Sequence, residues 1–160
     1  MEREAESGRG AAPGRDRRPA TLDLVGQWRA RLRFVSGDFA AFDDLEFMYV
    51  FNLGGTMTES SNYDAAPPVP PAYGIWRQVG PGRFETKYEF YPTRPPAALA
   101  ELTAGKGWLA AGRGIFSETI TVADDGETFS SIVRYEAFDG AGAPVDGGGQ
   151  GEGRGVRLRF

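Results

Sequence analysis

The clearest pattern in the chain is a strict alternation of apolar and charged positions over residues 83–90. One set of alternate positions holds Phe84, Thr86, Tyr88 and Phe90, and charged residues fill the positions between them. Because successive side chains of a β-strand point to opposite faces, this pattern predicts a strand with one buried and one solvent-facing side. The turn-forming sequence GPG at 80–82 precedes it, which predicts an antiparallel hairpin with a strand at 74–79.

Similar patterns predict further strands along the chain. The predicted set is 28–34, 45–53, 56–60, 74–79, 83–91, 113–122, 128–138 and 156–160. The segment 45–53 is apolar on both faces, which indicates cover on both sides or an outer face used in association. The glycine-rich segment 139–155 is predicted to be a mobile connection, and 97–104 has the composition of a short helix.

Eight strands joined by short turns predict an all-β protein, an antiparallel up-and-down barrel of about eight strands. Closure of the last strand against the first would remove the exposed edges of an open sheet, although an open β-sandwich is the alternative. The helical segment is expected to be a lid or a cap at one barrel end. Residues 21–160 are predicted to form this single domain, and the charged residues 1–20 a disordered N-terminal tail.

Composition narrows the chemistry that the chain can perform. It has no cysteine and no histidine, which excludes disulfides, thiolate sites and imidazole catalysis, and no cofactor or metal site is expected. A formal net charge of −4 argues against a nucleic-acid partner. No stretch is apolar enough to cross a membrane as a helix, and the tail lacks the apolar region of a secretion signal. A cytoplasmic protein without membrane contact is therefore expected.

The sequence LVGQW at 24–28 resembles the Gly-x-Trp signature of lipocalins and the wider calycin superfamily. The segments EFMYVFNLGGTMTES and YGIWRQVGPGRFETKYEF are similar to those of lipocalin-like bacterial proteins. The resemblance implies a barrel closed at one end by Trp28, with an arginine of the last strand, Arg157 or Arg159, packed over its ring. A match to the second lipocalin motif is missing, so the resemblance is to calycin-like barrels rather than to true secreted lipocalins.

The predicted inward faces are aromatic with a few polar groups, a composition typical of a pocket for an apolar ligand. The candidate ligand-binding residues are Trp76, Thr86, Tyr88, Phe90, Phe116, Ser131 and Tyr135. A solid, fully packed core is the alternative. Glu118 is the candidate catalytic residue, because desolvation on a buried face would raise its pKa and permit acid–base chemistry. Two other interpretations remain open, namely an ion pair with an inward arginine and an outward position of Glu118.

These features suggest a protein that binds a hydrophobic or amphipathic small molecule inside the barrel. One hypothesis makes it a cofactor-free cyclase or isomerase, since the chain loosely resembles β-barrel cyclases of actinomycete natural-product pathways such as polyketide synthesis. Such a barrel can accelerate an intramolecular reaction by holding a reactive conformer in a dry cavity. The alternative is a non-catalytic carrier. A third hypothesis is self-association, as a homodimer, through the two-sided apolar strand.

Overall fold

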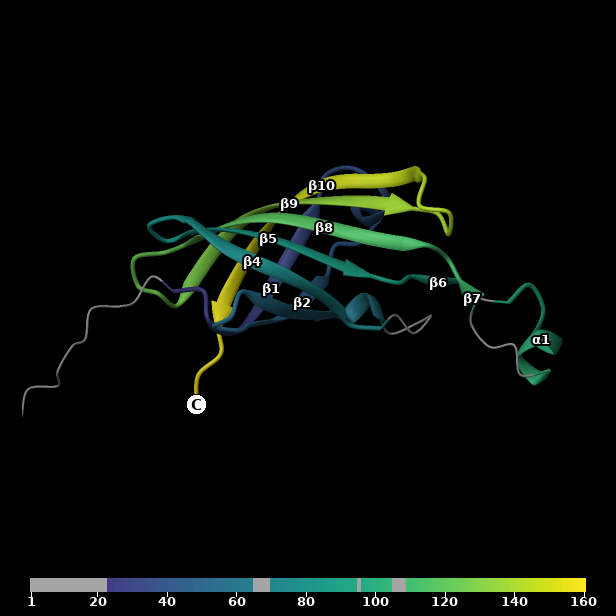
Figure 1. The fold of residues 1–160 in the computed structure, drawn as a ribbon, viewed down its shortest axis with the longest axis horizontal. Helices are drawn as coiled ribbons and strands as arrows, with labels where there is room; N and C mark the ends of the chain where they lie inside the picture. The colour runs from purple at the N-terminus through teal and green to yellow at the C-terminus, as the bar shows by residue number, and fades with distance from the viewer. Residues whose placement is uncertain (1–22, 65–69, 95, 105–108) are drawn as a thin grey trace, which may run out of the picture.

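A computed structural model describes residues 23–64, 70–94, 96–104 and 109–160, and eight of its strands close into an antiparallel barrel (Figure 1). The barrel strands are β1 (Gly26–Phe34), β2 (Leu45–Phe51), β3 (Thr56–Ser61), β4 (Ala72–Gly80), β5 (Arg83–Phe90), β8 (Arg113–Val122), β9 (Thr128–Phe138) and β10 (Pro144–Arg157). Each pairs with the next barrel strand along the chain, and β10 pairs with β1. This arrangement confirms the predicted up-and-down barrel. The predicted tail, 1–20, lies outside the described residues.

Alternation of side chains puts one face of every long strand inside. In β1 the buried positions are those of Trp28, Ala30, Leu32 and Phe34, and three arginines lie between them on the outside. The same inward alternation holds for β2, β5, β8 and the first eight residues of β9. The sequence period predicts it in β5, β8 and β9, but not in the continuous apolar run of β2. The outer face of β2 carries Met48 and Val50, both partly exposed, and association through them stays a prediction.

Strand β10 corrects the expectation of a mobile connection at 139–155. It is 14 residues long and pairs with both β1 and β9. In its second half, buried Gly151, Gly153 and Gly155 alternate with exposed polar residues. Glycine carries no apolar side chain, so the inward half of the period was invisible to a search for hydrophobic alternation. The regular spacing of the glycines was the available signal.

The glycines leave room inside the barrel for large side chains from neighbouring strands. A methyl group on Gly155 would collide with the ring of Phe129, and one on Gly153 would collide with the hydroxyl of Ser131. One wall of the interior is therefore bare backbone. The other strands supply the rings that fill the space in front of it.

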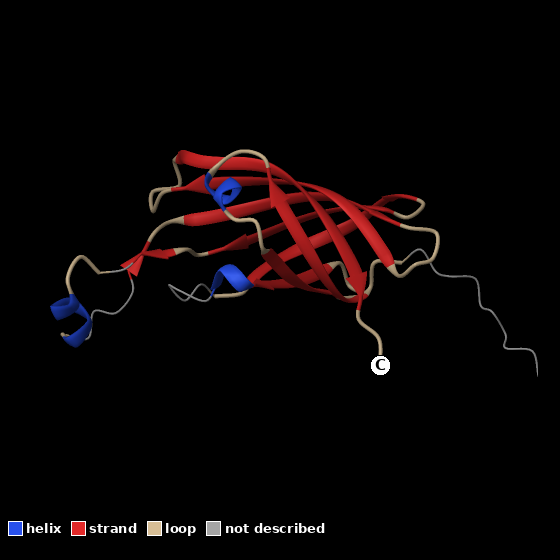
Figure 2. Cartoon of the chain, turned by 180° about the vertical axis from the view of Figure 1, so that it is seen from behind, coloured by secondary structure: helices blue, strands red, loops and turns tan. Residues whose placement is uncertain are grey.

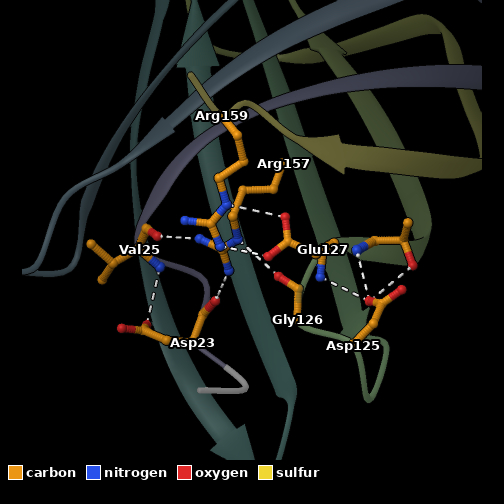
Figure 3. A network of polar contacts seen from close by, with 8 residues as sticks. Asp23, Val25, Asp125, Gly126, Glu127, Arg157 and Arg159 are labelled. Atoms are coloured by element: carbon orange, nitrogen blue, oxygen red, sulfur yellow. Dashed lines mark hydrogen bonds and ion pairs between the residues drawn. The ribbon is translucent and has the colours of Figure 1, made fainter. Parts of the chain in front are cut away.

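Trp28 and Arg157 close one end of the barrel. Figure 3 shows Arg157 beside Asp23, Val25 and Gly126. The Trp28 ring is fully buried, and its Nε1 donates to the carbonyl of Leu24 at 2.9 Å. The guanidinium carbon of Arg157 lies 4.2 Å from the centroid of this ring. Arg157 also donates to the carbonyls of Gly126 (2.8 Å), Val25 (2.6 Å) and Asp23. The arginine over the tryptophan is thus Arg157, whereas Arg159 pairs with exposed Glu127.

The opposite end, called the mouth below, carries the short helical segments η1 (Asp38–Ala41) and η2 (Asn62–Asp64) (Figure 2). A two-stranded ribbon, β6 (Thr93–Arg94) with β7 (Leu109–Ala110), leaves the barrel from this end. The predicted short helix is α1 (Leu99–Thr103). Figures 1 and 2 show that α1 stands at the far end of the ribbon, away from the barrel. No helix among the described residues is both long and apolar enough to span a membrane.

Candidate acid–base and binding site inside the barrel

Glu118 lies on β8 between Phe116 and Ile120, with its side chain inside the barrel and only 3% of the residue exposed. The inward alternation of β8 therefore extends through a charged residue. Among the described residues no ion pair involves Glu118, and the buried polar side chains are Glu59, Thr86, Glu118 and Ser131. The structure thus contradicts both alternative interpretations, an outward Glu118 and a partner arginine inside.

Two tyrosines converge on one oxygen of this carboxyl group. The hydroxyl of Tyr49, from β2, lies 3.2 Å from Oε2 of Glu118, and that of Tyr88, from β5, lies 3.4 Å away. The two hydroxyls are 3.2 Å apart. Both tyrosines are fully buried. Strand β2 and the neighbouring strands β5 and β8 therefore hold one buried acid–phenol cluster inside the barrel.

Burial sets the protonation of this cluster. Desolvation raises the pKa of Glu118 from 4.5 to about 7, against the opposing effects of the Ser131, Tyr49 and Tyr88 hydroxyls. Burial raises the pKa of Tyr49 well above 10, with a further contribution from the charge of Glu118. The pKa of Tyr88 is raised in the same way, by burial first and then by interaction with Tyr49. Near neutral pH the phenols keep their protons, whereas Glu118 can exchange its own.

Three polar atoms around the cluster have no hydrogen-bond partner among the described residues: Oε1 of Glu118, Oγ1 of Thr86 and Oγ of Ser131. Thr86 is paired with Glu118 across β5 and β8, and Ser131 lies on the adjacent strand β9. The Ser131 hydroxyl lies near enough to Glu118 to lower the pKa of its carboxyl group, without the geometry of a full hydrogen bond. Buried polar atoms in proteins are normally paired, so this layer can accept the polar groups of a water molecule or a ligand.

Gly153 on β10 faces this layer. A Cβ atom at that position would lie 3.5 Å from Oε1 of Glu118 and would overlap the Ser131 hydroxyl. Two of the three unpaired oxygens, those of Glu118 and Ser131, therefore lie beside the bare-backbone wall of the barrel, where β10 has no side chain.

Aromatic rings fill the interior between the cluster and the mouth. A void of about 10 Å³, the size of a single water molecule, lies near the mouth. Its lining is Phe39, Phe47, Glu59, Ser61, Tyr63, Pro70, Phe90 and Phe116. Phe39, on η1, covers it, with its ring centroid 5.1 Å from that of Tyr63 and 5.7 Å from that of Phe116. The pocket predicted from sequence is thus nearly closed in this structure.

Most of the predicted site residues share the interior. Thr86, Tyr88, Phe116 and Ser131 surround or adjoin the carboxyl of Glu118, and Phe90 and Tyr135 lie nearer the mouth. Trp76 does not join them. It lies toward the closed end, where its Nε1 donates to the carbonyl of Asn52 at 3.0 Å and its ring packs between Phe51 and Phe84.

Sequence reasoning left Tyr49, Glu59 and Phe39 out of the candidate catalytic and ligand-binding residues. Tyr49 is hidden in an apolar run, where no alternation marks an inward hydroxyl. Glu59 pairs with Tyr49 across β2 and β3, a register that only the closed barrel defines. Phe39 lies in the connection between β1 and β2, outside any predicted strand. The acidic residue at an inward position of the 56–60 strand was the one available signal.

A larger and open hollow lies on the outer surface, across β4, β5, β8 and β9. Its exposed apolar side chains are Ile75 and Ile132, and charged residues such as Lys87 and Arg134 surround them. The inward side chain of Glu118 is not exposed there. The buried cluster, with its perturbed pKa and unpaired oxygens, is the stronger candidate site. The described residues bring together no group of three or more carboxylate, histidine or cysteine side chains suited to a metal.

No protein-family model matches this sequence, and no curated protein matches it. The architecture, a closed eight-stranded antiparallel barrel with Arg157 over Trp28 at one end, is compatible with a lipocalin-like fold.

Proposed function

We propose that the protein is a lipocalin-like barrel that binds a hydrophobic or amphipathic small molecule in its interior. The ligand enters from the mouth. The observation that carries this proposal is the layer of unpaired, buried oxygens of Thr86, Glu118 and Ser131 in an otherwise aromatic interior. A ligand with an apolar body and one or two polar groups would supply the missing partners and keep the rings covered.

Entry requires the aromatic cover to move. Phe39 sits on a four-residue helical turn in a loop, whereas the rings beneath it belong to barrel strands. Displacement of Phe39 would open the existing void, and a shift of Phe116 would extend that void toward Glu118, its inward neighbour on β8. The small void thus marks the start of a path and not the whole site.

The test uses the neutral fluorescent probe N-phenyl-1-naphthylamine. Binding to the wild-type protein should enhance its fluorescence, and Phe39→Ala should tighten binding several-fold because it removes the cover. Tyr91→Ala, which truncates an exposed ring outside the barrel, is the matched control and should change nothing. Ile132→Glu places a charge in the outer hollow and should also leave binding unchanged. If Ile132→Glu abolishes probe binding and Phe39→Ala leaves the affinity unchanged, the probe binds in the outer hollow and the proposal is contradicted.

A second candidate function, a cofactor-free isomerase or cyclase, is favoured by the Glu118 carboxyl itself. Its pKa of about 7 suits proton exchange at neutral pH, and its buried Oε1 has no hydrogen-bond partner among the described residues. Two neutral phenols lie near Oε2. In such a reaction Glu118 would remove a proton from a carbon of the bound substrate and return a proton at another position. The Tyr49 and Tyr88 hydroxyls would stabilise the carboxylate that takes the proton in the first step and forms again in the second; between the two steps Glu118 would be the neutral acid.

Native mass spectrometry of protein isolated from its own host would reveal any compound that co-purifies. That compound is then incubated in D₂O with the wild-type protein and with Glu118→Gln. An isomerase should release an isomer containing one deuteron with the wild type, and Glu118→Gln should not. If the compound is recovered unchanged and without deuterium from both proteins, the isomerase is contradicted and a non-catalytic carrier is supported.

A further inference from the structure

The mouth void combines a carboxyl group with the faces and edges of several rings. Glu59, on β3, is 5% exposed and lines the void together with the hydroxyl-bearing Ser61. The aromatic lining comprises Phe39, Phe47, Tyr63, Phe90 and Phe116, contributed by η1, β2, η2, β5 and β8. Five separate elements therefore supply rings to the void that Glu59 also lines.

Such a lining discriminates by charge. Aromatic faces carry negative potential and attract an ammonium group, and a carboxylate in the same cavity adds to that attraction. An anionic group would meet unfavourable potential from both the rings and the carboxylate. A neutral apolar group would fill the cavity but would gain nothing from Glu59. The chemistry of the void thus favours a cation.

The connection between β1 and β2, which lies at the mouth, is also acidic. The connection between β1 and β2, residues 35–44, contains Asp38, Asp43 and Asp44 and no basic residue. Asp43 is paired with Arg33 of β1 at 2.8 Å. Asp38 lies close enough to contribute to raising the pKa of Tyr135 to about 12, after burial and Tyr63. A cation that approaches along this connection would meet its carboxylates before it reached the cavity.

We infer that the ligand of the barrel carries a protonated or quaternary amine, and that the ammonium head sits in the mouth between Glu59 and the surrounding rings. This inference rests on the proposed binding function and names its ligand class. The apolar body of the ligand then extends inward past Phe116, toward the polar layer at Glu118. Glu59 acts as the charge-selecting group, and Phe39 closes over the head.

The test compares two probes of almost identical shape, choline and its neutral carbon isostere 3,3-dimethylbutan-1-ol. Each is titrated into the isotopically labelled full-length protein and followed by NMR chemical shifts. Choline should bind the wild type at least roughly tenfold more tightly than the alcohol, with the largest shifts at Phe47, Glu59 and Phe90. Equal or tighter binding of the alcohol would overturn the inference, and so would choline shifts confined to the outer surface.

Glu59→Gln keeps the shape of the side chain and removes its charge. It should weaken choline binding at least roughly tenfold and leave the alcohol within about twofold. Glu46→Gln, at an exposed position on β2, is the matched control and should alter neither affinity. The wild-type comparison decides the matter even if Glu59→Gln does not fold.

The outcomes separate this inference from the proposed function. If N-phenyl-1-naphthylamine binds inside the barrel but choline is not preferred over the alcohol, the inference of an amine ligand is refuted. The proposed interior site for a small molecule is then still supported. Failure of all three probes to bind would overturn both.

Discussion

At the scale of single residues, the protein is defined by a carboxyl group that it keeps inside an aromatic core. Isolated burial of an ionised carboxylate is costly, and proteins commonly respond by holding such a group neutral. Glu118 follows this rule, since its pKa of about 7 results mainly from desolvation. Its two tyrosine partners remain protonated at the same pH because burial raises their pKa values too. Ionisation of the cluster at alkaline pH therefore lowers the free energy of unfolding.

The first prediction concerns this pH dependence. In the unfolded chain Glu118 ionises near 4.5 and in the folded protein near 7, so between these values the folded state holds the extra proton. The free energy of unfolding should therefore fall as pH rises from about 4.5 to 7. The pKa difference corresponds to roughly 3 kcal/mol. Glu118→Gln should lack this component, and its stability relative to wild type should rise by about that amount across the window.

Urea unfolding of both proteins at several pH values between 4 and 8 provides the measurement. The exposed carboxyls of Asp125 and Glu127, whose pKa values are lowered by hydrogen bonds, give the opposite trend. They are present in both proteins, so their effect cancels in the difference. Parallel pH profiles for the two proteins would show that Glu118 has an ordinary pKa.

At the scale of elements, β10 shows how a strand can contribute to a core by leaving space. Its buried positions are glycines; the Phe129 ring of β9 occupies the volume in front of Gly155, and the Ser131 hydroxyl that in front of Gly153. A glycine within a strand weakens it locally, because it loses more conformational entropy on folding and packs no side chain. Here that cost is offset by the burial of Phe129 against Trp28, whose ring centroids are 5.1 Å apart.

The second prediction tests this role of β10. Gly155→Ala should destabilise the protein by roughly 1–3 kcal/mol, because the added methyl group meets the Phe129 ring. The backbone at Gly155 has no positive φ, so alanine carries no conformational strain there. Gly140→Ala is the matched control, since no atom lies within 4 Å of the added methyl, and it should be neutral or slightly stabilising. Urea midpoints check both.

A smaller ring should relieve the clash at Gly155. The double variant Gly155→Ala with Phe129→Leu should be more stable than the sum of the two single changes allows. Strict additivity would indicate that Gly155 is not required for the packing of Phe129.

At the scale of the whole molecule, closure joins the first barrel strand to the last. Strand β1 pairs with β10 along seven residue pairs, from Trp28 with Arg157 to Phe34 with Gly151. Arg157 then ties three segments together through the carbonyls of Asp23, Val25 and Gly126, as well as covering Trp28. A barrel has no free edge only when this last seam is made.

The third prediction is that Arg157 stabilises the closed barrel and Arg159 does not. Arg157→Met keeps the aliphatic stem but loses the carbonyl hydrogen bonds and the contact of the charge with Trp28, so it should cost roughly 2–4 kcal/mol. Arg159→Met removes only an exposed ion pair with Glu127 and should cost less than about 1 kcal/mol. Arg157→Lys should restore little, because an ammonium cannot donate to three carbonyls in the geometry of a guanidinium.

Thermal or urea unfolding monitored by circular dichroism distinguishes these variants. If Arg157→Met and Arg159→Met lose equal stability, the contacts of Arg157 at the closed end contribute no more than a surface ion pair.

The sequence by itself determined the β class, the approximate strand count, the order of pairing and the inward faces of the well-patterned strands. Physically, these features follow from local alternation and turn chemistry, which each segment carries alone. Alternation also placed Glu118, Thr86 and Ser131 inside. Where the inward positions are glycines, as in β10, or the apolar run is continuous, as in β2, the local signal disappeared. The mobile connection predicted at 139–155 was wrong for that reason.

The tertiary structure alone decided which inward groups meet. Tyr49, Tyr88 and Glu118 are far apart in the chain, and their hydroxyl and carboxyl groups converge only because the barrel closes with one particular register. Closure also placed Trp76 at the opposite end from the mouth and Glu59 beside the void. It left that void at about 10 Å³, a size set by how rings from separate strands interlock. Such packing depends on pairs of distant residues, which no local pattern encodes.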